Sequence, residues 1–203
     1  MLLAFDTSSA ACTAALFDGS GECVARMDEI IDRGHAERLV PMIAHLIDGR
    51  SVAHILVGVG PGSFTGIRVA IAAAHGMAIG WGAELRGLSS LALIAAGAQA
   101  QGDVAVAVLG GHGELFLQQF DGASLEPRTE LSNAAPSNGA KLLSADLVVG
   151  SGSKALIDAR GWGEARELWP SAANALRLPL ALRNRPAKPI YARAPDAKVR
   201  EVA

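Results

Sequence analysis

Short apolar runs open the chain and predict a meander of β-strands. Three runs follow one another with turn residues between them, and they predict strands at residues 2–5, 13–17 and 23–27. A further apolar run at 55–59, bounded by Gly58 and Gly60, predicts a buried strand. Closely spaced strands of this kind pair antiparallel, so we expect an antiparallel sheet at the start of the fold.

Three segments between and after these strands show the periodicity of helices. Apolar residues with i, i+3, i+4 spacing predict a helix at 36–48, in which Pro41 permits a kink or a later start. A second helix is expected from Phe64 or Thr65 to Gly80, with Ser63 as its N-cap, and a third at 89–98. Strands followed by strand–helix alternation indicate an α/β or mixed α+β fold.

A polar break at 99–103 separates a second part with a weaker pattern. Strands are expected at 104–109, 115–120 and 147–149, and helices at 154–159 and 171–178, whereas 124–139 gives little signal. The proline-rich and basic end of the chain predicts an extended closing segment. We therefore expect a first lobe at 1–100, a smaller second lobe at 101–188 and a tail at 189–203.

The helix at 64–80 is apolar on nearly every side. One side carries Gly66, Ala70, Ala73, Met77 and Gly80, and the other carries Val69, Ala72, Gly76 and Ile79. Such a helix needs cover all round, and its small residues allow another helix to approach closely. A second subunit and the interior of the same domain explain this pattern equally well.

The amino-acid composition argues against several classes of function. Half of the residues are hydrophobic, 19% are charged, and the formal net charge is −2. The chain lacks the basic excess typical of a protein that binds nucleic acid by itself. Two cysteines, Cys12 and Cys23, make no disulfide framework and are expected to be buried thiols in a reducing compartment. No secretory signal or membrane-spanning run stands out, so we expect a cytoplasmic protein.

Three motifs could hold a phosphate group, and each has a plainer interpretation. Asp6, Thr7 and Ser8 in DTSS could hold a phosphate and its metal, or form a hydrogen-bonded hairpin turn. The glycine-rich GVGPGSFTGIR lacks the ending of a P-loop and could simply let a strand and a helix pack closely. GSGSK at 150–154 has the same two interpretations. For DTSS and the glycine-rich segment we favour the structural interpretation.

No catalytic or metal-binding set emerges from the other polar residues. No two of the five histidines stand four residues apart on one helix, since Leu39 follows His35 at that spacing. No serine lies in a nucleophile elbow, and Cys12 has no histidine near it in sequence. We expect no metal in this chain.

Four segments resemble the TsaB family, also called YeaZ: LLAFDTSSAACTAALF, RGHAERLVPMI, VGVGPGSFTGIRVAIAAAHGMA and PIYARAPDAK. The resemblance implies an α/β, actin-like, ribonuclease-H-like fold of two lobes, shared with sugar kinases and Hsp70, with a reduced second lobe. It also implies a heterodimer with TsaD, whose metal-binding H-x-x-x-H motif matches His35 and Leu39 here. This chain departs from many relatives at Gly110-Gly111-His112, where they carry Asp-Ala-Arg.

The resemblance implies a non-catalytic subunit of the complex that adds threonylcarbamoyl to the tRNA adenosine next to the anticodon. Its partners would be a TsaD-type catalytic subunit and a TsaE-type ATPase, with tRNA bound only through the complex and ATP or ADP only at a subunit boundary. Without TsaD, a homodimer through the same helices is expected. The implied interface residues are His35, Leu39, Met42, Ile43, Leu46, Gly66, Val69, Ala70, Ala73 and Met77.

Two other functions remain as alternatives. One is a stand-alone ATP-dependent phosphotransferase or ATPase that uses DTSS and GSGSK as phosphate loops. The other is the older family label of glycoprotease, which needs a metal or a nucleophile that the sequence does not display.

Overall fold

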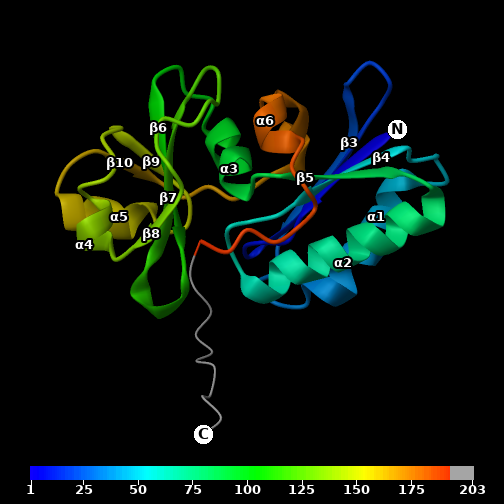
Figure 1. The fold of residues 1–203 in the computed structure, drawn as a ribbon, viewed down its shortest axis with the longest axis horizontal. Helices are drawn as coiled ribbons and strands as arrows, with labels where there is room; N and C mark the ends of the chain where they lie inside the picture. Colours follow the sequence, from blue (N-terminus) through cyan, green and yellow to red (C-terminus); the bar gives the residue numbers. More distant parts are fainter. Residues whose placement is uncertain (193–203) are drawn as a thin grey trace, which may run out of the picture.

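A computed structural model describes residues 1–192 and contains two five-stranded sheets side by side (Figure 1). The first sheet has the order β3-β2-β1-β4-β5. Its strands are β1 (Leu2–Asp6), β2 (Ala11–Phe17), β3 (Cys23–Ile30), β4 (His54–Gly58) and β5 (Glu84–Leu88). The first three form the predicted antiparallel meander, whereas β4 and β5 run parallel to β1.

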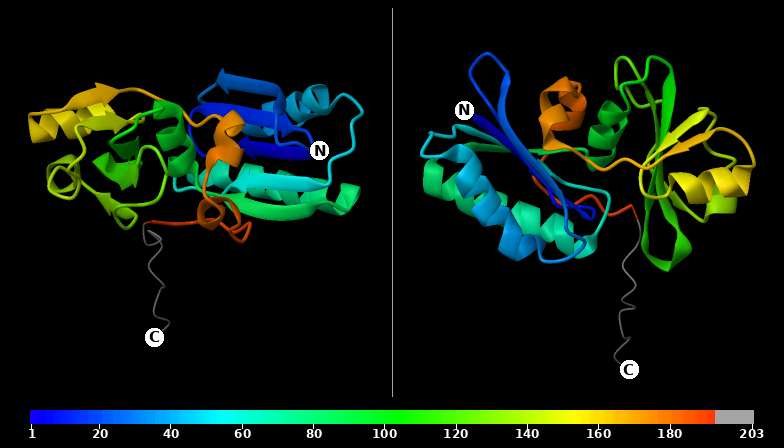
Figure 2. Two further views of the ribbon diagram at one scale, coloured as in Figure 1. Left: turned by 90° about the horizontal axis from the view of Figure 1, so that it is seen from above. Right: turned by 180° about the vertical axis from the view of Figure 1, so that it is seen from behind.

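Helices cover both faces of this sheet. On one face lie α1 (His35–Ile47) and α2 (Phe64–Trp81), which pack against each other as well as on the strands. Their inward side chains share a core with Leu3, Phe5 and Ile55 of the sheet. On the other face lie α3 (Ser90–Ala98), the 3₁₀ helix η2 (Ala172–Arg177) and α6 (Leu180–Arg183) (Figures 1 and 2).

The second sheet has the order β10-β9-β6-β7-β8. Its strands are β6 (Asp103–Leu109), β7 (Leu115–Asp121), β8 (Ser132–Ala134), β9 (Leu147–Val149) and β10 (Glu164–Arg166). The hairpin of β6 and β7 turns through the short 3₁₀ helix η1 (Gly111–Gly113). Two helices, α4 (Pro136–Gly139) and α5 (Ser153–Arg160), cover the side of this sheet that faces away from the first sheet (Figure 2).

Helix α3 joins the two sheets through one continuous core. Eight of its nine residues are buried. They pack in the same cluster as Ala4 and Leu56 of the first sheet and Val106 and Phe120 of the second. The hydrophobic sequence of α3 therefore reflects burial on all sides.

Several predictions need correction. The short elements β5, β8, β10, α4 and α6 were not expected, because three- or four-residue elements and the half-exposed β5 show no apolar periodicity. The segment predicted as a helix at 171–178 is a 3₁₀ helix. Cys12 is buried as expected, but Cys23 is exposed because β3 lies at the sheet edge.

The end of the described chain returns to the first sheet. Gly87 of β5 and Arg185 exchange two backbone hydrogen bonds, and the Ile190 N–H donates to the Val59 carbonyl at 2.8 Å. The rest of the predicted tail, 193–203, lies outside the described residues. None of the helices within 1–192 has both the length and the apolarity that crossing a bilayer requires.

Candidate functional site

The glycine-rich segment forms a tight turn that leads into α2. The Gly60–Pro61 peptide bond is cis, and the Ser63 hydroxyl accepts a hydrogen bond from the Gly66 N–H at 3.2 Å, as predicted for an N-cap. A methyl group on Gly66 would lie 1.9 Å from the Thr7 carbonyl oxygen, and one on Gly62 would lie 2.1 Å from the Ser8 carbonyl oxygen. These glycines therefore permit a close approach of the turn to the DTSS segment.

Asp6, Thr7 and Ser8 are buried at this contact and bond within the chain. One carboxyl oxygen of Asp6 accepts from the N–H and hydroxyl of Ser8, at 2.6 and 2.7 Å. The other accepts from the hydroxyl of Ser90 at the start of α3. The Thr7 hydroxyl donates to the Gly66 carbonyl at 2.7 Å. This junction supports the structural interpretation of DTSS.

Ser90 completes this junction, and no motif in the sequence predicts this role. Its hydroxyl also accepts from the Gly60 N–H at 3.1 Å, so one side chain ties β1, the glycine turn and α3 together. Asp6 and Ser90 are 84 positions apart in the sequence, so a local sequence pattern does not predict their contact.

GSGSK is also a packed turn, built against β6. A methyl group on Gly150 would lie 2.4 Å from the Ala107 carbonyl oxygen, and the Ser151 hydroxyl accepts from the Leu109 N–H at 3.1 Å. Lys154 pairs with Asp158 on the exposed side of α5.

The residues proposed for the interface lie at different depths. Six of them are buried in the chain's own core, where a partner reaches them only if the core opens: Leu39, Met42, Ile43, Leu46, Gly66 and Ala70. Four are half-buried: His35, Val69, Ala73 and Met77. The core stripe of α2 also includes Ile67, Ile71 and Ala74, which the two predicted sides of the helix omitted.

An apolar surface remains on the outer side of α1 and α2, which we call the outer helix face. It comprises Ala36, Val40 and Ala44 of α1 and Ala72, Gly76 and Ile79 of α2, all exposed. Val40 is 51% exposed and Ile79 is 85% exposed, and a methyl group on Gly76 would meet no atom within 4 Å. In Figures 1 and 2, no described element covers these helices on the side away from the sheet.

Helix α1 is fixed to the sheet edge by an ion pair. The Arg38 guanidinium donates to both carboxyl oxygens of Glu29 in β3, and these hydrogen bonds lower the pKa of Glu29. Burial, assisted by the charge of Glu29, raises the pKa of the neighbouring Cys12 thiol to about 11. Cys12 is therefore an unreactive core residue.

The described residues form no group of three or more His, Cys, Asp or Glu that could hold a metal ion. His35 lies at the start of α1, and its Nε2 is buried without a hydrogen-bond partner. Leu39, which follows His35 by four residues in α1, is fully buried.

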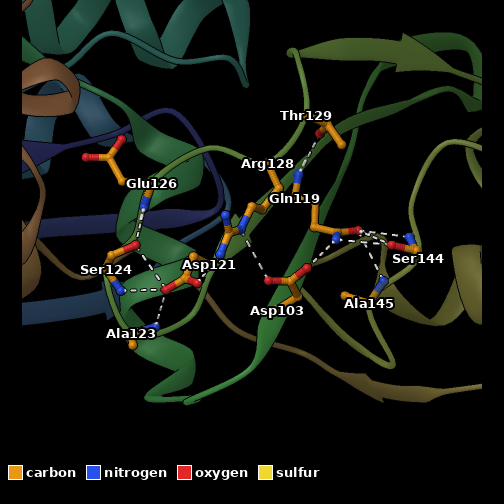
Figure 3. A network of polar contacts seen from close by, with 10 residues as sticks. All are labelled: Asp103, Gln119, Asp121, Ala123, Ser124, Glu126, Arg128, Thr129, Ser144 and Ala145. Atoms are coloured by element: carbon orange, nitrogen blue, oxygen red, sulfur yellow. Dashed lines mark hydrogen bonds and ion pairs between the residues drawn. The ribbon is translucent and has the colours of Figure 1, made fainter.

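The second sheet carries a separate polar network at the edge of the β6–β7 hairpin (Figure 3). The buried Gln119 donates to Asp103 at 2.9 Å and to the Ser144 hydroxyl at 3.2 Å. Its carbonyl oxygen accepts from the backbone N–H groups of Ser144 and Ala145. All polar atoms of this side chain are thus satisfied, so Gln119 fixes the loop before β9.

Asp121 organises the neighbouring turn of this network (Figure 3). Its carboxylate accepts hydrogen bonds from the backbone N–H groups of Ala123 and Ser124, and it pairs with Arg128. The bonds from Ser124, backbone and hydroxyl, followed by the Arg128 pair, lower the pKa of Asp121 to about 2. These contacts are structural.

The two sheets, the helices around them and the shared core at α3 define a two-lobed actin-like fold. The solved structure of YeaZ from Pseudomonas aeruginosa superposes with a TM-score of 0.78 at 29% identity, covering 94% of this chain and 98% of that one. A family model described as TsaD, tRNA N6-adenosine threonylcarbamoyltransferase, matches residues 27–138, more than half of the chain.

Sequence comparison finds relatives of the same kind. The tRNA threonylcarbamoyladenosine biosynthesis protein TsaB of Escherichia coli K12 is 39% identical over 103 residues, which are 48% of this chain and 43% of that protein. An uncharacterized protein of Mycobacterium tuberculosis H37Rv is 30% identical over 97% of this chain and 93% of its own length. This chain belongs to the TsaB/YeaZ family. The alignment with the E. coli protein spans less than half of that protein's length.

Proposed function

We propose that this chain is a partner subunit for threonylcarbamoyladenosine modification of tRNA, which heterodimerises with a TsaD-type catalytic subunit through the outer helix face. Family membership supports the pathway, because the E. coli relative bears the name of a threonylcarbamoyladenosine biosynthesis protein. The observation that carries the mode of action is the bare apolar surface of α1 and α2.

The chemistry of this surface suits a helix of another subunit. Ala72 and Gly76 stand four residues apart, so they form a shallow track in which a partner helix can lie close to the backbone. Ile79 and Val40 extend from this surface and would lose their contact with water on binding. The track belongs to residues 27–138, the part that matches the TsaD model, and this match makes a related actin-like protein a natural partner.

Helix α1 also indicates which of the two subunits would carry out catalysis. Leu39 replaces one histidine of the TsaD metal motif and is part of the core, so we assign the metal and the transfer step to the partner. We expect a TsaE-type ATPase, ATP or ADP at a subunit boundary, and tRNA contacts through the complex, all in the cytoplasm. The junction at Asp6 then serves to hold α2 in place.

A charge placed on the outer helix face tests this proposal. Ala72 is exposed, so Ala72→Glu leaves the fold of the isolated chain intact. In a heterodimer it would bury an unpaired carboxylate, which we expect to cost about 3 kcal/mol and to weaken binding about 100-fold. Binding of a purified TsaD-type protein would be measured by calorimetry.

The matched control is Ala159→Glu, which places the same charge on an exposed alanine of α5 in the second lobe. We expect this variant to bind like the unmodified chain. Equal affinities of the two variants, or no binding of the unmodified chain, would contradict the heterodimer. Equal melting temperatures of the variants show that folding is preserved.

A further inference from the structure

Two aromatic rings and an arginine form an exposed cluster at the start of α2. The guanidinium carbon of Arg68 lies 3.6 Å from the centre of the Phe64 ring, and its Nε–H donates to the Tyr191 hydroxyl at 3.1 Å. The centres of the two rings are 5.7 Å apart. Phe64 is 56% exposed and Tyr191 is 48% exposed, so much of each ring is open to solvent. We call these three residues the aromatic cluster.

The fold holds the aromatic cluster in place. Phe64 and Arg68 lie about one turn apart in α2. Tyr191 comes from the end of the described chain, where the Ile190 N–H donates to the Val59 carbonyl at 2.8 Å. Figure 1 shows this end of the chain, in red, close to the start of α2. Because the rings are already positioned, a flat ligand that binds there orders few further groups.

The segments that carry the aromatic cluster are free of acidic residues. Residues 49–83 and 168–192 contain no aspartate or glutamate. They do contain the exposed cations Arg68 and Lys188. Asp6, in the neighbouring DTSS segment, is buried and accepts hydrogen bonds within the chain. The local charge therefore favours an anionic ligand, although the formal net charge of the whole chain is −2.

A second arginine–aromatic pair, in the second lobe, is built differently. The guanidinium carbon of Arg160 lies 3.6 Å from the centre of the Trp162 ring. This guanidinium donates to backbone carbonyls, among them those of Leu143 and Ala145, and the acidic Glu164 follows two residues after the ring. Arg160 therefore holds a loop of its own lobe. Trp162, which is 46% exposed, serves as a matched control for the aromatic cluster.

We propose that the aromatic cluster binds an unpaired base of RNA, which stacks on Phe64 or Tyr191 while Arg68 attracts the adjoining phosphate. Unpaired bases stack on aromatic rings whatever their sequence, and a neighbouring cation adds attraction for the RNA backbone. The choice of RNA rests on the proposed function, in which tRNA is the substrate of the complex. The cluster lies at the start of α2, whereas Gly76 and Ile79 lie toward its end, so bound RNA would run beside a subunit on the outer helix face (Figure 1).

Photo-cross-linking tests this site on the full chain without any partner. The probe is a short single-stranded RNA that contains thiouridine, and mass spectrometry identifies the cross-linked peptides. We expect cross-links at the peptides of Phe64 and Tyr191, their loss when both residues are changed to leucine, and their retention in Trp162→Leu. Equal melting temperatures of the variants show that folding is preserved. The proposal is overturned if cross-links are absent, map elsewhere or persist in the double variant. Displacement of the RNA by ATP at equal concentration would assign the cluster to a free nucleotide instead.

Binding of a tRNA transcript to the heterodimer with a TsaD-type protein supplies the second readout. Phe64→Leu should raise the dissociation constant for tRNA about tenfold, the effect of losing one stacked base, and leave the affinity for the TsaD-type protein unchanged. Trp162→Leu should change neither value. Unchanged tRNA binding in Phe64→Leu would overturn the proposal, and an equal loss of both affinities would mark a protein contact instead. If the heterodimer does not form, the proposed function fails, while cross-linking of the isolated chain still decides whether the cluster binds RNA.

Discussion

Removing the hydroxyl of Ser90 tests how the junction of β1, the glycine turn and α3 is held. In Ser90→Ala, one buried carboxyl oxygen of Asp6 loses its donor, and the buried Gly60 N–H loses its acceptor. A hydrogen bond to a carboxylate contributes about 1.5–3 kcal/mol, and an orphaned buried N–H costs about 1–3 kcal/mol. We therefore expect a loss of about 3–5 kcal/mol in the free energy of unfolding.

The assay is equilibrium unfolding in urea at pH 7, followed by circular dichroism. The control is Ser89→Ala, which removes the N-cap of α3, a hydroxyl that accepts from the Ala92 N–H at 3.3 Å. That variant should lose about 1 kcal/mol. A loss in Ser90→Ala no larger than in Ser89→Ala, at an unchanged slope of the transition, would refute the account of this junction.

Three further predictions follow from individual residues. A thiol reagent should label Cys23 in the folded protein and Cys12 only after unfolding, because burial raises the pKa of Cys12 to about 11; rapid labelling of both would contradict its burial. Gly66→Ala should destabilise strongly through the 1.9 Å clash with a backbone carbonyl, whereas Gly76→Ala should raise the free energy of unfolding by about 0.5–1 kcal/mol, as thermal melts would show. The pKa of Asp121 is lowered to about 2 from an ordinary 3.8, so its stabilising contribution is complete above pH 3.8 and is lost as the pH falls through 2. Asp121→Asn should flatten acid unfolding in that window, and an unchanged profile would contradict the network.

The strongly periodic elements could be predicted from the sequence. The apolar runs of β1, β2 and β4 and the helices α1, α2 and α3 gave clear patterns because their buried faces repeat with a fixed period. The three-residue strands β8 and β10 could not be predicted, since they contain less than one useful period. Strand β5 was hidden by its charged, half-exposed residues.

The candidate site was only partly accessible to sequence reasoning. The composition of α2 indicated that it needs cover on several sides, but it did not tell which side faces the chain's own sheet. The structure places Ile67, Ile71 and Ala74 inside and Ala72, Gly76 and Ile79 outside. Contacts such as that of Asp6 with Ser90 depend on the three-dimensional arrangement of distant segments, which a local pattern does not encode.

The most direct test of the proposed function measures threonylcarbamoyladenosine in cellular tRNA by mass spectrometry. Cells depleted of this chain would be complemented with the unmodified sequence, Ala72→Glu or Ala159→Glu, each at matched abundance. We predict that depletion lowers the modified nucleoside, and that the unmodified chain and Ala159→Glu restore it while Ala72→Glu does not. Unchanged modification after depletion, or full restoration by Ala72→Glu, would contradict a partner subunit that acts through the outer helix face.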